Sequence, residues 1–437
     1  FRPTTENMHR SGNEVPFWSA VAMGIGAMVG AGIFALLGEA AFIAGSAVWI
    51  SFLLGGAIAL LSGYSFSKLG ARYPSAGGVV EYLVQGFGVG RFSGAMSVMM
   101  YIASLVAISL VARTFGSYAC ALLPEQSPAW LVETLAASVV LVFMFVNLDG
   151  ARSMARLENI VVLVKMTALV AFIVIGMIYI SPERLSPKDY PPVSAIIYSV
   201  AVTFFAYEGF RIITNAAEDM PDPARTLPRA ITTAIVLVLV VYTGIAITVL
   251  GNLSPAEVVS AKHFALAEAA RPVLGQAGFG IVAVAALFAT ASAINASLYA
   301  VTNVTYRLAK LGELPAPFLR PVRHSREGLV VSSAIIITLA VFLDLSSIAA
   351  IGALSMLFLH MTVHLGHLRV LKETGAVRSL VYGAIAANGL VFLIGSYHLM
   401  QTRPSLLAWI GGFVFVAFLT EFVLHRITAR SVKPRVD

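Results

Sequence analysis

A single lysine interrupts one of the most apolar runs of the sequence. Lys165 lies about one to two helical turns into a stretch that is long enough to cross a bilayer. Charged groups inside a membrane are costly and mark functional sites by default, and a lysine can release its proton where an arginine cannot. Lys165 is therefore a candidate proton carrier. The alternative is that its long side chain only reaches the headgroup region.

Glycines and charges interrupt two other apolar runs. Residues 24–32 contain four glycines in nine positions, and residues 204–211 place a glycine between Glu208 and Arg211. Each glycine costs about 1 kcal/mol of helix propensity relative to alanine, so both runs predict broken helices. A broken helix exposes N–H groups that bind anions and carbonyls that bind cations, and an amino acid zwitterion carries both charges. Alternatively, the glycines only let helices cross closely.

These two interruptions are the predicted binding site for a small zwitterion. Backbone amides of the first run would meet the carboxylate, and carbonyls of both runs would accept the ammonium group. The predicted substrate contacts are Met28, Gly30, Ala31, Gly32, Phe205, Ala206, Tyr207 and Glu208.

Glu208 and Arg211 stand three residues apart, a spacing that allows an ion pair on one helix face. Such a pair would be structural or would gate the site. Otherwise Glu208 could bind a cationic side chain and Arg211 an anionic one. Two further charged residues, Glu39 and Arg113, fall near the ends of apolar runs, where we expect interfacial or vestibule positions.

Three histidines, His360, His364 and His367, share one face of a later run. Metal binding and proton relay are possible, but only Glu373 could complete a ligand set nearby, so packing is favoured and no metal is expected.

The sequence contains no Walker loop and neither hydrolase motif, Gly-x-Ser-x-Gly or His-Glu-x-x-His, which disfavours ATP-driven pumping and enzymatic activity. One cysteine, Cys120, allows no internal disulfide. The only coupling ion expected is a proton.

The composition shows which kind of element must position these residues. Of 437 residues, 58% are hydrophobic and 12% are charged, against about 25% charged in soluble domains. The charges cluster between apolar runs of about 20 residues, the length that spans a bilayer. We therefore expect an all-α membrane protein embedded in the lipid bilayer, with no obligatory protein partner evident. The chain begins at Phe1 without an initiator methionine, so we expect it to be trimmed.

The apolar runs predict about twelve spans. They are Phe17–Ala44, Ala47–Leu69, Phe92–Leu122, Trp130–Asn147, Ile160–Ile180, Val193–Ala216, Ala230–Gly251, Phe279–Leu308, Leu329–Phe342, Ser347–Val370, Val381–Leu399 and Leu406–Ile427. With a cytoplasmic N-terminus, the inner side holds 21 of the 29 Lys and Arg residues and the outer side holds 6. This bias predicts that both termini are cytoplasmic in the cell (inner) membrane. It also explains the net charge of +7 without nucleic acid.

The two interrupted runs are the first and sixth spans, which is typical of an inverted repeat of five spans each. The predicted units are a cytoplasmic N-terminal segment, two repeats, two additional C-terminal spans and a cytoplasmic tail. Their bounds are 1–16, 17–180, 193–370, 378–427 and 428–437.

Several motifs resemble the amino acid/polyamine/organocation transporter superfamily. They include Gly26-x-x-x-Gly30-Ala31-Gly32-Ile33-Phe34, the stretch 204–210 and the stretch 215–223 with its Pro-Asp-Pro ending. The resemblance implies the LeuT-type fold, in which the first and sixth helices are broken. Around Lys165 and residues 308–315, the chain is similar to proton-coupled, broad-specificity prokaryotic amino acid transporters. In those proteins a lysine replaces a bound cation, which implies that Lys165 contacts the Gly26 carbonyl and Ser292.

The sequence thus predicts proton-coupled symport of amino acids by alternating access. As implied by the resemblance, protonated Lys165 would hold the first span, and loss of its proton would release that span. The chain differs from the proton-coupled relatives at Glu208 and Arg211, and Glu208 motivates the alternative of an antiporter or carrier of polyamines or other cations. A membrane sensor is disfavoured, because only residues 428–437 follow the last span.

Overall fold

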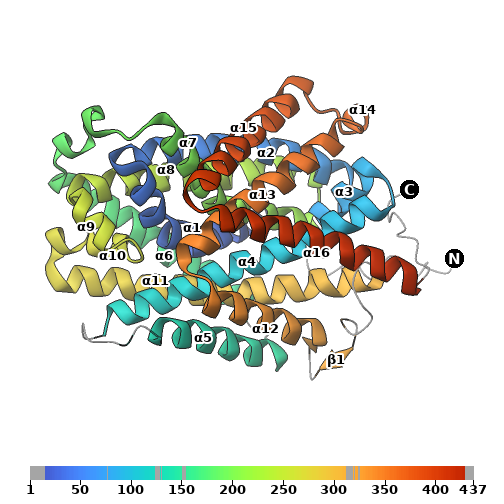
Figure 1. The fold of residues 1–437 in the computed structure, drawn as a ribbon, viewed down its shortest axis with the longest axis horizontal. Coiled ribbons are helices and arrows are strands. Elements are labelled where there is room, and N and C mark those ends of the chain that lie inside the picture. The colour runs from blue at the N-terminus through green and yellow to red at the C-terminus, as the bar shows by residue number, and fades with distance from the viewer. Residues whose placement is uncertain are drawn as a thin grey trace.

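The computed structural model describes residues 15–75, 77–123, 128, 130–149, 154–311, 318, 320–322 and 325–428. The predicted N-terminal segment and C-terminal tail lie almost wholly outside these residues. Within them the regular elements are helices apart from one pair of two-residue strands, and the long helices run side by side along the longest axis (Figure 1). The first half contains α1 (Phe17–Ala44), η2 (Gly45–Ala47), α2 (Val48–Arg72), α3 (Val79–Phe87), α4 (Arg91–Ala121), α5 (Leu131–Leu148), α6 (Met154–Gly176), η3 (Met177–Tyr179), η4 (Pro182–Leu185) and η5 (Pro187–Asp189).

The second half is also almost entirely helical. It contains α7 (Val193–Ala206), η6 (Glu208–Asp219), α8 (Pro223–Asn252), α9 (Pro255–Ser260), α10 (Ala265–Glu268), α11 (Arg271–Leu311), β1 (Pro321–Val322), β2 (Ser325–Arg326), α12 (Glu327–Phe342), α13 (Leu345–His367), α14 (Leu371–Thr374), α15 (Arg378–Thr402) and α16 (Pro404–Thr428). Each of the twelve predicted spans coincides with one or two of these helices. Ten stretches of the described residues are long and apolar enough to cross a membrane, and shorter apolar helices at 17–30 and 327–342 accompany them. The prediction of an all-α membrane protein is confirmed.

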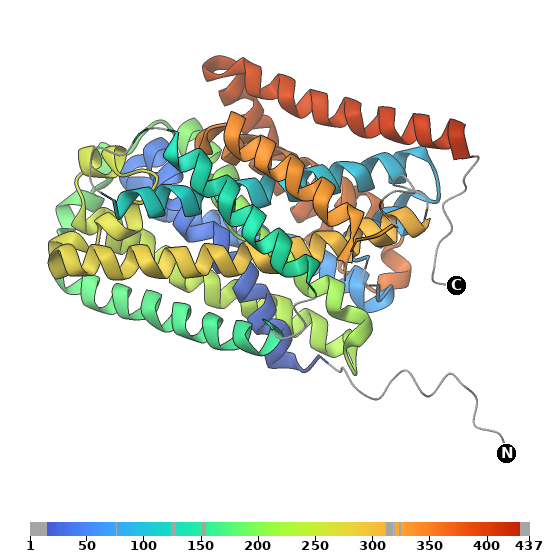
Figure 2. The same ribbon diagram turned by 90° about the horizontal axis from the view of Figure 1, so that it is seen from below.

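Helix α1 lies at the centre of the bundle. It packs against α4, α6, α7, α8, α11 and η6, and most of its side chains are buried. By contrast, α16 lies along one edge (Figure 2), and large apolar side chains such as Phe415 and Val423 are exposed on it. A surface of this kind is stable in lipid, where the hydrocarbon replaces the core that a soluble protein would need.

The break predicted in the sixth span is present. Helix α7 ends at Ala206, and a 3-10 helix, η6, continues from Glu208 for 12 residues. Because the 3-10 geometry is strained, runs beyond three or four residues are uncommon and often mark functional positions.

The first span differs from the prediction, because α1 is one continuous helix from Phe17 to Ala44. Its glycines allow close packing instead. A β-carbon at Gly30 would collide with Ala293 of α11, and one at Gly32 would collide with Tyr242 of α8. Tertiary packing therefore outweighs the low helix propensity of these positions.

Candidate functional site

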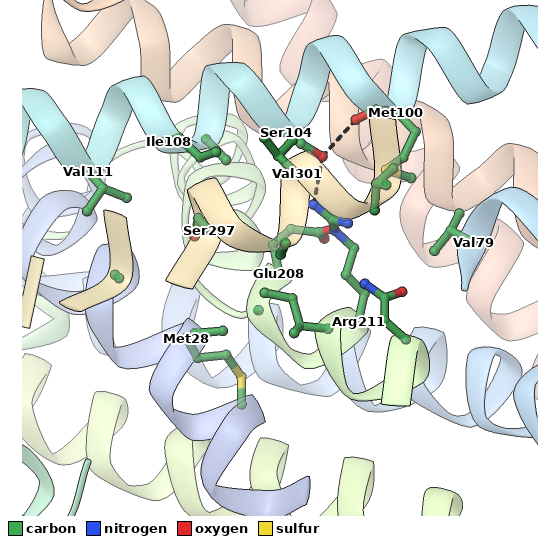
Figure 3. A pocket seen from close by; sticks show the side chains of 18 of the residues that line it. Met28, Val79, Met100, Ser104, Ile108, Val111, Glu208, Arg211, Ser297 and Val301 are labelled. Atoms are coloured by element: carbon green, nitrogen blue, oxygen red, sulfur yellow. Dashed lines mark hydrogen bonds and ion pairs between the residues drawn. The ribbon is translucent and has the colours of Figure 1, made fainter. Parts of the chain in front are cut away.

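A cavity of about 110 Å³ lies beside the point where α7 gives way to η6. Its walls come from α1, α4, η6 and α11, with α3 at one end (Figure 3). Most of the lining is apolar: Ile108 and Val111 of α4 and Val301 of α11 face the space, while Glu208 and Arg211 project into it from η6. The site thus combines an apolar chamber with one internal pair of opposite charges.

The cavity brings together about half of the predicted substrate contacts. The lining includes Met28, Phe205, Ala206 and Glu208, and also Arg211, the predicted gating or specificity residue. The side chain of Ala31 lies outside the described residues. The lining residues thus surround one cavity, and their role as ligand contacts stays a prediction.

Three other predicted contacts are not among the lining residues. Gly30 and Gly32 pack against neighbouring helices, as described above. Tyr207 is fully buried, and its hydroxyl donates a hydrogen bond to the Phe52 carbonyl of α2 at 2.9 Å. A side chain held in this way fixes the end of α7 against α2.

The sequence did not identify which residues of α4 form the wall of the cavity. Ser104 is the one polar residue of the α4 wall that hydrogen-bonds the charged pair: its hydroxyl accepts a bond from Arg211 Nη2 at 3.0 Å (Figure 3). It also donates to the Met100 carbonyl one helical turn away. Ser104 is one of five serines in α4, so no signal in the sequence distinguished it from the other hydroxyl groups of that span.

The charged pair on η6 forms as predicted. Arg211 Nε lies 2.6 Å from Glu208 Oε1, and the other carboxylate oxygen, Oε2, lies 2.9 Å from His360 Nε2 of α13. Both Glu208 and His360 are buried, with exposed fractions of 5% and 0%. Each carboxylate oxygen therefore lies within ion-pair distance of a side-chain nitrogen.

The histidine face of α13 is used to join helices. His364 hydrogen-bonds Ser62 and Ser65 of α2, and His367 hydrogen-bonds Ser65 and Thr374. Within the described residues, no group of three or more His, Cys, Asp or Glu side chains could hold a metal ion. The packing role favoured for this face is confirmed for these two histidines, while His360 faces Glu208.

Lys165 is buried in α6, with an exposed fraction of 5%. Its ammonium donates a hydrogen bond to the Gly26 carbonyl of α1 at 2.9 Å, which is one of the two predicted contacts. The snorkelling alternative is excluded by this burial. Ser292 lies on α11, which packs against both α1 and α6, and its role in coupling stays a prediction. Ala27 and Met28, which follow Gly26, line the cavity, so the lysine holds α1 directly beside that space.

A second group of charges, which we call the Glu39 cluster, joins α1 to the loop between α9 and α10. Buried Glu39 Oε1 lies 3.6 Å from Lys262 Nζ and 3.4 Å from His263 Nδ1. Burial lowers the pKa of His263 to about 4, and the positive charges of Lys262 and Arg113 add to this effect. The fold therefore favours the neutral ring of His263 at neutral pH.

This pKa predicts a pH-dependent loss of stability at the Glu39 cluster. Because the pKa of His263 falls from 6.5 to about 4 on folding, its contribution is complete above pH 6.5 and is lost as the pH falls toward 4. We expect the midpoint of thermal unfolding to drop further between pH 7.5 and pH 4.5 in the wild type than in His263→Gln, which cannot titrate. The carboxylates titrate in both proteins, so equal drops would contradict the prediction.

Comparison with known proteins assigns nearly the full length of the chain to one protein family. Residues 16–428 match the family model for amino acid permeases. An uncharacterized protein of Methanocaldococcus jannaschii is 34% identical over 427 residues, which cover 97% of this chain and 98% of that protein. The inner membrane transport protein YbaT of Escherichia coli is 35% identical over 411 residues, 94% of this chain and 96% of that protein. The methylthioribose transporter of Bacillus subtilis is 29% identical over 318 residues, 68% and 67% of the two chains.

The family match covers all the helices that build the cavity, and the two relatives with assigned names given above are a transport protein and a transporter. The resemblance seen in the sequence motifs is confirmed. The chain belongs to the amino acid permease family of the amino acid/polyamine/organocation superfamily, and it is a multi-pass membrane transporter rather than an enzyme.

Proposed function

We propose that this transporter is a symporter that couples amino acid uptake to proton entry by alternating access. The observation that carries the proposal is the buried Lys165 ammonium on the Gly26 carbonyl, beside the cavity. A charged donor makes a hydrogen bond about twice as strong as a neutral one, so the protonated lysine anchors α1 to α6. When the proton leaves, this anchor weakens and α1 is free to move.

The cavity supports an amino acid with a neutral side chain as the substrate. Its volume suits a small molecule, and its walls are apolar apart from groups that already pair with one another. The carbonyls that end α7 and the N–H groups that begin η6 would hold the ammonium and carboxylate groups, since backbone at a helix break carries unsatisfied polar groups. Glu208 is paired with Arg211, which weighs against a carrier of polyamines or other cations.

The proposal includes a cell membrane location with both termini in the cytoplasm. It is supported by the excess of Lys and Arg in the predicted inner loops. Alternating access would then open the cavity toward the two sides in turn, with α1 and η6 as the moving elements. Both elements pack against several other helices, so a shift of either one would be felt by those neighbours.

Uptake into proteoliposomes tests the function. We expect a labelled mixture of neutral amino acids to accumulate when an inward proton gradient is imposed without sodium, and the accumulation to collapse with a protonophore. Methylthioribose, named for one relative, serves as a non-amino-acid control. Uptake that needs sodium, or that appears only as exchange with internal substrate, would contradict proton coupling. Preferential uptake of spermidine or potassium would contradict the substrate class.

A further inference from the structure

The cavity carries a single pair of opposite charges. Among its described lining residues, Glu208 is the only acidic side chain and Arg211 the only basic one. The two groups compensate each other at 2.6 Å, so the pair leaves no net charge for a ligand. The remaining walls are apolar or weakly polar (Figure 3).

Both oxygens of Glu208 lie close to a nitrogen of a neighbouring side chain. Arg211 Nε lies 2.6 Å from Oε1, and His360 Nε2 lies 2.9 Å from Oε2. The histidine is fully buried and is enclosed by the rings of Phe66, Phe204 and Phe210, with centroids 4.7 to 5.8 Å away. Aromatic packing on several sides fixes this ring, so Oε2 keeps its partner.

Arg211 is fixed from the opposite direction. Its Nη2 donates to Ser104 Oγ at 3.0 Å, across the cavity from η6 to α4 (Figure 3). With Nε on Glu208 and Nη2 on Ser104, the guanidinium spans the space between the two walls. An incoming ammonium would have to displace this guanidinium to reach the carboxylate.

We propose that Arg211 and His360 determine the side-chain specificity of the transporter by capping Glu208. The inference rests on the proposed amino acid substrate and adds the reason for its neutral class. A cationic side chain entering the chamber loses its hydration and gains no free carboxylate in return, which disfavours its binding. Removal of the Arg211 cap exposes a buried carboxylate and turns the same chamber into a site for cationic amino acids. Arg211 contacts the site directly, whereas His360 is a positioning residue.

Binding to purified protein at fixed pH, without any gradient, tests the proposal. We expect lysine to displace labelled leucine from the wild type only weakly, and to compete about tenfold better or more with Arg211→Gln, the size of effect that one freed charge contact gives. The double variant Glu208→Gln/Arg211→Gln removes both charges and should return to the wild-type preference. Arg211→Lys, which keeps the positive charge, should stay close to the wild type.

His360 is tested by a matched pair of variants. His360→Phe keeps the ring but cannot reach Oε2 with a donor, and we expect it to raise lysine competition partway toward Arg211→Gln. His360→Gln restores a donor amide and should restore the wild-type preference. A merely structural histidine would change leucine and lysine affinity equally in both variants. This pair carries the test if Arg211→Gln is not recovered as folded protein.

The outcomes separate the inference from the proposed function. Equal competition by lysine and leucine in the wild type, or unchanged lysine competition in Arg211→Gln, would overturn the specificity role. Absence of amino acid binding by every variant would overturn it as well. If the lysine preference shifts as expected while liposomes show no proton-driven uptake, the specificity role stands and the coupling proposal fails.

Discussion

We expect the replacement of Lys165 by alanine to abolish proton-driven accumulation of amino acids in proteoliposomes, with uptake reduced to the level of empty liposomes. The reason is that Lys165 is the buried group that joins α6 to the Gly26 carbonyl of α1. In the proposed mechanism Lys165 carries the proton, so its removal leaves no carrier and deprives α1 of a charge-assisted anchor. We expect counterflow, which needs no proton movement, to remain measurable because the cavity walls are unchanged.

Two control variants make this result specific. Lys165→Arg keeps a positive charge that is not released near neutral pH, so it should retain binding and still fail to accumulate substrate under a proton gradient. Lys188→Ala removes an exposed lysine from η5 and should leave uptake unchanged. Full proton-driven uptake by Lys165→Ala would eliminate the lysine as the coupling group.

The helices of this protein were predictable because lipid imposes a simple rule on sequence. Each span must be apolar for about 20 residues, and charges mark the points where the chain leaves the membrane. The bounds predicted for α1, Phe17–Ala44, are those of the structure, and α5 and α12 agree within two residues. The pair of Glu208 and Arg211 was also predictable, since its spacing lies within one helix face.

The remainder of the site depends on contacts between distant segments. His360 meets Glu208 across more than 150 positions of sequence, and Ser104 meets Arg211 across 107. Helical periodicity identifies which residues share a face but not which faces meet. The row of three histidines therefore looked like one group, although the structure gives His360 a different partner from the other two.

The glycines of α1 are a second case in which the sequence of one helix does not show its neighbours. Low helix propensity predicted a break, yet the structure uses Gly30 to bring α1 against α11. A helix break and close helix packing both favour glycine, and the sequence of one helix does not distinguish them. The contact between Gly30 and Ala293 in the structure shows that this glycine serves close packing.

This packing predicts that Gly30→Leu destabilises the protein strongly. A β-carbon at Gly30 would overlap that of Ala293, so any side chain forces the two helices apart, and overpacking of this kind costs about 1–3 kcal/mol. Leucine adds three carbons beyond the β-carbon, so its cost lies toward the upper end of that range and exceeds the roughly 1 kcal/mol that replacing a helical glycine returns in propensity. We expect a lower midpoint of thermal unfolding in detergent and loss of uptake, since α1 borders the cavity.

Matched variants identify the collision as the cause. Gly411→Leu places the same side chain on α16, where nothing lies within 4 Å of the added β-carbon, and it should unfold at the wild-type temperature or slightly above. Gly30→Ala should already lower the midpoint, and the additional change Ala293→Gly should restore it by vacating the space. If Gly30→Leu unfolds with the wild type, or if Ala293→Gly does not rescue Gly30→Ala, then α1 and α11 do not meet through Gly30, and the glycine serves the backbone of α1 instead.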